Sequence, residues 1–398
     1  MNILLIASRF PWPPRRGDQA RALQVAELLA LDHRVTLLVP EPPGPERPAA
    51  PAELPYRLET YRRSSPVASA TGVGRALLRG LPLQSGLFRN RDLKRRLRRL
   101  APASDLAILQ LVRLARHLPD LGATPVVVDL VDSLALSTEK RSRLDCRMLR
   151  PALRWEARSL ARWEVRLVRE ASAAMVVSGR DREAIARDLP PEAAARLHVV
   201  PLAVPAPEPV RPADRPGSPL LVVTGNLGYF PTAEGLLWFL AEVWPRLRAR
   251  RPELQLLAAG DRPSARLLRA LAGAGARLEE SPSELRPILE RATVALAPMR
   301  GGAGQPMKIL EAWAAGVPVV ATPWAAAGTT GRPGDDLLVA GDPDAWCRSI
   351  ECLVDDPGLR DRIATSARRR LAADYSRHSV GRRLEMIVAE ATASGAGP

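Results

Sequence analysis

The chain has 398 residues, 46% of them hydrophobic and 25% charged, which is the composition of a globular protein with room for two domains of ordinary size. The formal net charge is +15, but only three of the 58 basic residues are lysine, and this arginine excess with 39 prolines is typical of a GC-rich genome. Aromatic residues, at 4%, are too sparse to stack on bases and no nucleic-acid-binding motif is present, so we expect no nucleic-acid partner.

The sequence carries no segment that predicts membrane insertion or export. No apolar run approaches the ~18 residues of a membrane span, and residues 1–7 lack the basic start of a signal peptide. Cys146, Cys347 and Cys352 show neither disulfide nor metal-ligand spacing, which fits a reducing compartment. We therefore predict a cytoplasmic protein without a bound metal.

The chain begins with a strand, a helix and a second strand. Residues 2–8 and 33–39 are the expected strands, and residues 19–31 form the helix between them. The proline-rich turn after the first strand ends in Gly17 and Asp18. Glycine lets the backbone approach a ligand closely, so we expect these two residues to line a site. An ordinary surface turn is the alternative.

A strongly basic segment follows a proline-rich loop at residues 40–55. Leu93, Leu97 and Leu100 mark one face of a predicted helix, and arginines crowd the other face. Such a helix can lie on an anionic membrane surface. The alternative, which the sequence favours, is a solvated helix whose leucines pack on the core.

Two further strands, 105–112 and 125–132, extend the first sheet, and the second of them ends with Asp129 and Asp132. Open α/β sheets bind ligands at the carboxyl ends of their strands, so Asp132 is a candidate catalytic residue. Helix capping or a role at the sheet edge is the alternative for either aspartate. Four more elements are expected to be structural: helix 150–170, strand 173–178, helix 180–188 and strand 197–201.

Residues 201–219 have the proline-rich composition of a semi-rigid linker, and the alternation restarts after them. A strand at 220–224 leads into a loop that begins with Gly225 and Asn226, and Thr232 is expected to cap the next helix. The elements expected from there to residue 291 are helix 232–250, strand 254–260, helix 264–272, strand 277–279 and helix 283–291. We therefore predict a second α/β domain.

The most informative stretch is a glycine-rich turn between two strands. A buried strand at 293–298 precedes the turn, Pro306 takes the first position of a helix, and a strand resumes at 317–321. A helix N-terminus behind glycines presents N–H groups to a phosphate. Lys308 and Glu311 share one face of this helix, where they could neutralise a diphosphate and bind sugar hydroxyls. A solvated Lys–Glu pair on a plain turn is the alternative.

The segment G-Q-P-M-K-I-L-E-A-W-A-A-G-V-P-V-V-A-T, residues 304–322, resembles the donor-site helix of retaining glycosyltransferase family 4, in particular the bacterial sugar transferases associated with exosortase and exopolysaccharide systems. The motif T-G-N-L-G-Y-F-P-T is similar to a second motif of that subgroup. The resemblance implies the GT-B fold, an α/β architecture of two Rossmann-like domains facing across a cleft. The implied parts are an acceptor-side domain 1–203, a linker 204–219, a donor domain 220–375 and a terminal helix 376–398 that crosses back.

The resemblance also implies roles for individual residues. Glu311 matches the family glutamate that contacts the ribose, whereas Ala303 stands where the family has the glutamate that contacts the donor sugar. The second motif lacks the arginine and lysine that other members use on the diphosphate, which leaves Arg300 and Lys308 for that role. The donor-binding residues implied in this way are Gly17, Gly225, Asn226, Arg300, Gly302, Gly304, Gln305, Pro306, Lys308 and Glu311.

Asp132 stands where many family members have a histidine, and it or Asp18 would face the acceptor as the catalytic carboxylate. The implied function is retaining transfer of a sugar, by type a hexose, from a nucleotide-diphosphate sugar to a glycan, lipid-linked or small-molecule acceptor, as in polysaccharide biosynthesis. The resemblance implies no cofactor and no metal, and it allows peripheral contact with a membrane. Two alternatives stay open: a non-catalytic relative that binds a nucleotide sugar or supports a partner transferase, and a nucleotide-sugar 2-epimerase.

Overall fold

We describe the protein from a computed structural model that covers residues 1–14, 16–42, 50–64, 66–78, 80–205 and 218–394. Most of the segment predicted as a linker, residues 206–217, lies outside these described residues. The chain forms two compact units, Met1–Ala203 together with Arg377–Pro398, and Val204–Ser376. The chain therefore leaves the first unit once and returns to it at its end.

The first unit is built on a sheet of seven parallel strands in the order β3-β2-β1-β4-β5-β6-β7. Its strands are β1 (Asn2–Ile6), β2 (Arg34–Pro40), β3 (Arg57–Tyr61), β4 (Leu106–Gln110), β5 (Val126–Val131), β6 (Ala173–Val176) and β7 (Leu197–Val199). Successive side chains of a strand point to opposite faces, so Ile3 and Leu5 of β1 join one buried cluster and Leu4 and Ile6 join another. The sheet is therefore covered by apolar side chains on both faces, as is usual for parallel sheets.

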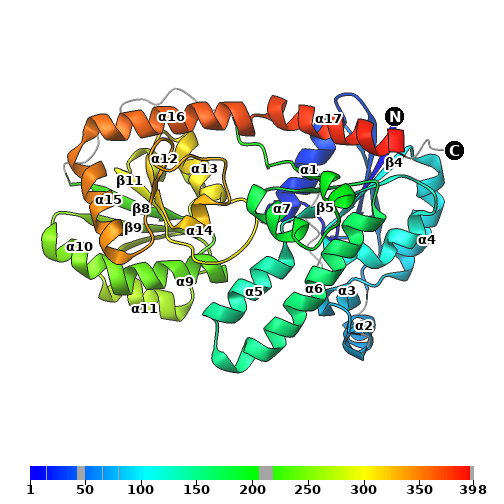
Figure 1. Ribbon diagram of the computed structural model, residues 1–398, viewed down its shortest axis with the longest axis horizontal. Coiled ribbons are helices and arrows are strands. Elements are labelled where there is room, and N and C mark those ends of the chain that lie inside the picture. Colours follow the sequence, from blue (N-terminus) through cyan, green and yellow to red (C-terminus); the bar gives the residue numbers. More distant parts are fainter. Residues whose placement is uncertain (15, 43–49, 65, 79, 206–217, 395–398) are drawn as a thin grey trace. The chain divides into compact units, whose positions relative to one another are not determined.

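Helices cover both faces of this first sheet. They are α1 (Gly17–Leu29), α2 (Pro66–Leu78), α3 (Leu83–Leu87), α4 (Arg91–Leu100), α5 (Leu134–Leu144), α6 (Arg150–Glu170), α7 (Gly179–Ala186), α8 (Pro191–Ala195) and the C-terminal α17 (Arg377–Ser394). Helix α17 lies beside α1 and shares its buried cluster (Figure 1). The sequence pattern predicts neither β3 nor α5, because β3 is a partly exposed edge strand and α5 has only two buried residues.

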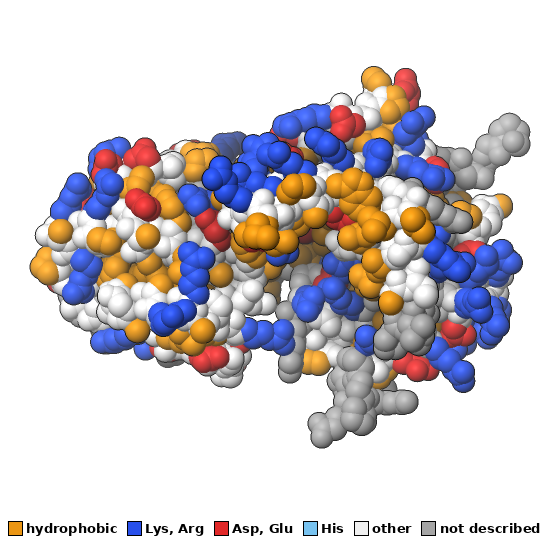
Figure 2. All heavy atoms as spheres, turned by 90° about the horizontal axis from the view of Figure 1, so that it is seen from below, with side chains coloured by type: hydrophobic (Ala, Val, Ile, Leu, Met, Phe, Trp, Pro, Cys, Tyr) orange, Lys and Arg blue, Asp and Glu red, His pale blue; other side chains and the backbone are white. Residues whose placement is uncertain are grey.

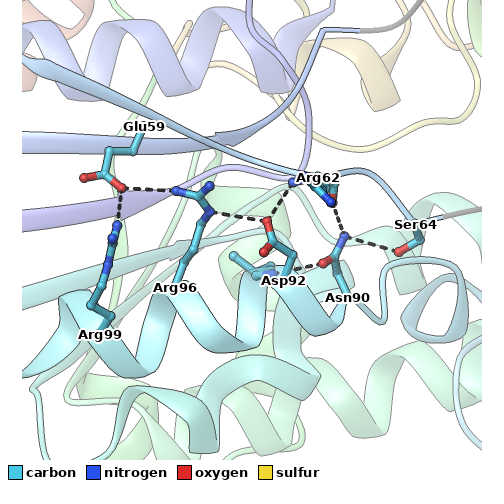
Figure 3. A network of polar contacts seen from close by, with 8 residues as sticks. Glu59, Arg62, Ser64, Asn90, Asp92, Arg96 and Arg99 are labelled. Carbon is cyan, nitrogen blue, oxygen red and sulfur yellow. Dashed lines mark hydrogen bonds and ion pairs between the residues drawn. The ribbon is translucent and has the colours of Figure 1, made fainter.

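The basic helix α4 is anchored by its own charges (Figure 3). Leu93 and Leu97 are fully buried in the core of the first unit. On the polar side, Arg99 donates to the carboxylate of Glu59 at 2.9 Å, and Arg96 reaches the same carboxylate at 3.5 Å. The leucines that would have entered a lipid surface are therefore core residues, in agreement with the interpretation that the sequence favours. Peripheral membrane contact stays a prediction.

The second unit is built on six parallel strands in the order β10-β9-β8-β11-β12-β13. Its strands are β8 (Leu220–Thr224), β9 (Gln255–Gly260), β10 (Arg277–Glu280), β11 (Val294–Ala297), β12 (Val319–Ala321) and β13 (Leu338–Val339). The helices around it are α9 (Phe230–Trp238), η4 (Phe239–Val243), α10 (Trp244–Arg250), α11 (Ala265–Gly273), α12 (Arg286–Glu290), α13 (Met307–Ala314), α14 (Pro323–Ala326), α15 (Pro343–Asp355) and α16 (Pro357–Tyr375). Two parallel sheets flanked by helices confirm the predicted α/β class.

The helix predicted at residues 232–250 differs from the expectation at two points. It begins at Phe230 with Tyr229 as its N-cap, so Thr232 lies inside the first turn and does not cap the helix. Pro231 explains the earlier start, because proline is favoured in the first turn. A π-helical segment, η4, interrupts the helix just before Pro245, which has no N–H to donate to the preceding turn.

Basic side chains are distributed over the face shown in Figure 2, among acidic and hydrophobic ones. None of the helices within the described residues combines the length and the apolar character that crossing a bilayer requires.

Candidate functional site

The second unit has a candidate site at the carboxyl ends of β8 and β11. These two strands are neighbours at the point where the strand order reverses, because β9 lies on the other side of β8. Open parallel sheets bind ligands at such a switch point, where the loops from neighbouring strands leave in opposite directions. Gly225 follows β8, and the loop that leads to α13 follows β11.

Lys308 reaches this switch point from the first turn of α13. Its ammonium donates a 3.0 Å hydrogen bond to Oγ1 of Thr232, and a Cβ at Gly225 would lie 3.5 Å from its Cε. The side chain is only 9% exposed, and burial lowers its pKa to about 8, although the charge of Glu311 opposes this shift. A poorly hydrated cation beside bare backbone is suited to an anionic ligand.

Glu311 lies one turn further along α13. Its side chain is half-buried, and burial raises its pKa while the charge of Lys308 lowers it. The two side chains therefore interact on one helix face, as their spacing predicts. Together they offer hydrogen-bond donors and acceptors at the same end of the helix.

The turn before α13 depends on glycine at two positions. Gly302 has a φ of 92° and Gly304 a φ of 77°, a left-handed conformation that costs other residues about 1 kcal/mol or more. A Cβ at Gly302 would also lie 3.1 Å from Pro231. Pro306 is the N-cap of α13 and not its first helical residue, which corrects the prediction by one position. The helix N-terminus therefore presents the amides that follow Pro306.

Arg300 is already held by protein groups. Its guanidinium pairs with the carboxylate of Glu234, with its Nε 3.4 Å from Oε2, and lies 5.2 Å from the centroid of the Trp238 ring. If Arg300 contacts a diphosphate, its guanidinium must bind the diphosphate together with the Glu234 carboxylate or in place of it. That role stays a prediction.

Three other predicted positions shape the loops around this site. Oδ1 of Asn226 accepts a 3.0 Å hydrogen bond from the amide of Gly228, so this side chain orders the loop after β8. Gln305 donates to the sulfur of Met307 at 3.4 Å. Ala303, at the position where the family that the sequence resembles has a glutamate, is half-buried in the same turn as the glycines. Asn226 and Gln305 therefore have local structural partners in this structure.

The first unit brings charged residues together at its own switch point, between β1 and β4. Gly17 is the exposed first residue of α1, and Asp18 follows it in the first helical turn. The carboxylate of Asp18 accepts a 2.7 Å hydrogen bond from Arg9 and lies 3.6 Å from Nη1 of Arg113. The loops after β1 and β4 therefore meet at Asp18.

Asp132 lies at the carboxyl end of β5, after an irregular strand end. The register with β6 shifts between Asp129 and Val131, and Val131 has a φ of 64°, which is rare for a β-branched residue. Such bulges re-aim side chains beside functional sites. Burial raises the pKa of Asp132 to about 7, the negative charges of Asp181 and Asp18 add to the shift, and the Arg113 guanidinium opposes it.

Asp129 is a structural residue. Its carboxylate accepts a 2.9 Å hydrogen bond from the buried Arg21, which also donates to the carbonyl of Pro201. Its other oxygen accepts a bond from the amide of Val131. This agrees with the structural role at the sheet edge that the sequence leaves open for Asp129. Asp132, three residues further along, remains the candidate catalytic residue.

Several residues near the two sites are absent from the predicted site residues. In the second unit they are Thr232 and Glu234, and in the first unit Arg9, Arg113 and Asp181. Each lies in the segment that follows the carboxyl end of a strand, at most ten residues after it, and this position is the one feature that could have identified them. Except for Arg9 and Asp18, which belong to the same connection, the partners come from other segments, so spacing along the chain contains no information about those pairs.

A buried glutamate supports the site in the first unit. Glu164 of α6 accepts hydrogen bonds from Oγ of Ser133 at 2.8 Å and from the amide of Ala135 at 3.0 Å, and burial raises its pKa to about 8. It thereby fixes the start of α5 directly after Asp132.

Within the described residues, no group of three His, Cys, Asp or Glu side chains could hold a metal ion.

Most of the second unit is similar to a known protein family. Residues 218–356 match the family described as glycosyl transferases group 1. A 138-residue part of the chain is 30% identical to the "uncharacterized 44.6 kDa protein in cps region" of Klebsiella pneumoniae. That match spans 33% of this chain and 36% of the Klebsiella protein, so the chain matches about a third of the length of its curated relative.

Solved structures with the same fold extend over almost the whole chain. Sucrose-phosphate synthase from Thermosynechococcus elongatus has a TM-score of 0.73 at 15% identity and covers 99% of both chains. HepE of Anabaena, in complex with UDP-glucose, has a TM-score of 0.65 at 13% identity and covers 98% of this chain and 99% of its own. WaaG, a glycosyltransferase involved in lipopolysaccharide biosynthesis, has a TM-score of 0.63 at 15% identity, with 97% and 99% covered. At these identities the likeness concerns the fold.

Proposed function

We propose that the protein transfers a sugar from a nucleotide-diphosphate sugar to a glycan, lipid-linked or small-molecule acceptor with retention. The match of residues 218–356 to the family described as glycosyl transferases group 1 and the GT-B fold of the chain support this proposal. The observation that carries the proposal is the buried Lys308 ammonium beside Gly225 at the switch point of the second sheet. Hexose transfer is the specific form that we propose, since HepE is described with UDP-glucose.

The role of the second unit would be electrostatic. The diphosphate gains negative charge as its bond to the anomeric carbon breaks. A fixed ammonium in a poorly hydrated site stabilises that charge more in the transition state than in the bound donor. Thr232 would hold Lys308 in place through its 3.0 Å bond, the amides after Pro306 would bind phosphate oxygens, and Glu311 would bind the ribose hydroxyls.

The first unit would contribute the acceptor side. Asp132 and Asp18 are the carboxylates proposed to orient the acceptor hydroxyl, and Gly17 lets that loop approach a ligand. A pKa of about 7 gives Asp132 access to both protonation states near neutral pH.

Donor binding and turnover test the proposal in two steps. We expect UDP-glucose, or another nucleotide sugar from a panel, to raise the Tm of the wild-type protein, and Glu311→Ala to weaken donor binding about tenfold or more. Glu242→Ala, which changes an exposed glutamate of the same unit, is the matched control. Unchanged donor binding in Glu311→Ala would remove Glu311 from the site.

Release of the nucleoside diphosphate distinguishes an enzyme from a binding protein. Ala303, in place of the sugar-contacting glutamate of the family, favours the non-catalytic relative as a second candidate. Release of nucleoside diphosphate from the donor at a higher rate in the wild-type protein than in Lys308→Met supports the transferase. Tight donor binding without any release, across acceptors from lysates of a polysaccharide-producing bacterium, would support the second candidate.

The 2-epimerase alternative has less support. It would need histidines beside the site carboxylates. His33 and His198 instead pair with Glu385 and Glu390 of α17, each at 2.9 Å, and His117 lies 3.1 Å from the carboxylate of Asp120.

A further inference from the structure

The switch point of the first unit brings guanidinium groups from two loops to one carboxylate, that of Asp18. Arg9 and Arg113 both reach Oδ2 of Asp18, at 2.7 and 3.6 Å. Arg16 is close enough to lower the pKa of both guanidinium groups. Two guanidinium groups therefore contact Asp18 and a third cation lies near them, while burial and the charge of Asp181 raise the pKa of the nearby Asp132 to about 7.

Arg113 is rigidly held and incompletely hydrogen-bonded. Its side chain is 15% exposed, its Nε donates to Oε1 of Gln84 at 2.8 Å, and its guanidinium lies 5.6 Å from the centroid of the Phe88 ring. Its Nη1 is buried and has no hydrogen-bond partner among the described residues. An unsatisfied buried donor on a charged group is costly, so the site is suited to an additional acceptor atom.

Ser8 adds a second unsatisfied donor next to Arg9. Ser8 lies two residues after the end of β1 and is 5% exposed. Its Oγ has no hydrogen-bond partner within the described part of the chain. Ser8 and Arg9 follow β1 and Arg113 follows the neighbouring strand β4, and a hydroxyl with two guanidinium groups is a donor set that phosphate and carboxylate oxygens bind.

The backbone that carries Arg113 is strained. Leu111, between the end of β4 and Arg113, has a φ of 69°, while its amide donates a 2.7 Å hydrogen bond to the carbonyl of Asp129. A non-glycine residue in this conformation costs about 1–3 kcal/mol, and such residues cluster at functional sites. The strain and the contacts of its guanidinium fix Arg113 at the switch point.

We propose that Ser8, Arg9 and Arg113 bind an anionic group, a phosphate or carboxylate, of the acceptor, so that the protein acts on acidic acceptors. This inference rests on the proposed function. The bound oxygens would replace part of the Asp18 contact with Arg9 and accept from Nη1 of Arg113. The donor diphosphate is the other source of such a group, but the second unit already supplies Lys308 and helix amides for it.

Inorganic phosphate is the first probe, at constant ionic strength and against chloride. We expect phosphate to raise the Tm of the wild-type protein with a fitted affinity that Arg113→Gln weakens about tenfold or more. Arg95→Gln, which removes the same charge from the exposed side of α4, should leave it unchanged. Equal phosphate affinity in wild type and Arg113→Gln overturns the proposal.

The second arm separates acceptor from donor. UDP-glucose affinity should stay within twofold of wild type in Arg113→Gln and Arg9→Gln, while it falls in Lys308→Met. A loss of UDP-glucose affinity in both arginine variants assigns the anion site to the donor and overturns the acceptor assignment. If neither the wild-type protein nor any variant binds a nucleotide sugar, the proposed function fails. The phosphate affinities of wild type and Arg113→Gln still decide whether Ser8, Arg9 and Arg113 form an anion site. Arg113→Lys keeps the charge and should recover part of the phosphate affinity if Arg113→Gln folds poorly.

Discussion

At the scale of single residues, burial of the Lys308 side chain sets the pH range in which its ammonium is charged. The ammonium of a solvent-exposed lysine stays protonated to about pH 10, but burial brings the pKa of Lys308 down to about 8. The charge is therefore present at neutral pH and is lost when the pH rises through about 8. An anionic ligand would favour the protonated form and so raise this pKa on binding.

This pKa gives a pH-dependent prediction for donor binding. The affinity for UDP-glucose should be constant between pH 7 and 7.5, and should fall by up to about tenfold per unit above pH 8, because binding then requires uptake of a proton. Isothermal titration calorimetry at several pH values, in buffers with different ionisation enthalpies, measures both the affinity and the proton uptake.

Lys308→Met is the control for that titration. It keeps most of the buried side-chain volume, binds more weakly at pH 7, and should show no further loss up to pH 9.5. A wild-type profile that is flat to pH 9.5 would mean that another group binds the diphosphate.

At the scale of elements, close contact between backbones gives the second site its shape. An ideal Cβ at Gly260, the last residue of β9, would lie 1.7 Å from the carbonyl oxygen of Gly225. Only glycine allows the end of β9 to approach the loop after β8 so closely, and this loop faces Lys308. Packing between strand ends therefore decides where the bare backbone beside the ammonium lies.

Two Gly→Ala substitutions in the second unit should have opposite effects. Gly260→Ala should lower the free energy of unfolding by about 3 kcal/mol or more and weaken donor binding, because the added methyl group forces the loop at Gly225 away. Gly273→Ala, at the last residue of α11 with no atom within 4 Å of the new Cβ, should stabilise by up to about 1 kcal/mol. Urea unfolding of both variants measures the difference. Equal effects would show that the backbone contact at Gly225 is not tight.

At the scale of the whole molecule, the two ends of the chain build one core. Helix α17 contributes Val380, Leu384 and Ile387 to the buried cluster that contains Ile3 and Leu5 of β1. The unit Val204–Ser376 has its own clusters on both faces of its sheet. A destabilising substitution in α17 should therefore lower the stability of the first unit and have little effect on the second.

Leu384→Ala tests this coupling. The side chain is 2% exposed, and its removal should cost about 2–5 kcal/mol and increase amide hydrogen exchange in β1, β2 and α1, with little change in β8 and β11. Met386→Ala, two residues away and 71% exposed, should change stability by less than about 0.5 kcal/mol. Loss of protection in β8 at the same time would mean that the two units unfold as one.

Local patterns in the sequence determine much of this protein. Buried parallel strands are continuous apolar runs, so β1, β5, β8 and β11 and the glycine-rich turn before α13 can be predicted from residues that are neighbours along the chain. The same holds for the electrostatic interaction between Lys308 and Glu311, which follows from helical spacing.

Only the tertiary structure decides which charges meet across loops. Arg300 with Glu234, Lys308 with Thr232, and Arg113 with Asp18 join residues that lie 66, 76 and 95 positions apart, and strand order brings them together. Burial, which lowers the pKa of Lys308 and raises that of Asp132, is likewise a property of the packed chain. The sequence thus determines the elements, because their stability depends on local residue pattern, while the chemistry of the sites depends on distances and solvent exclusion that exist only after folding.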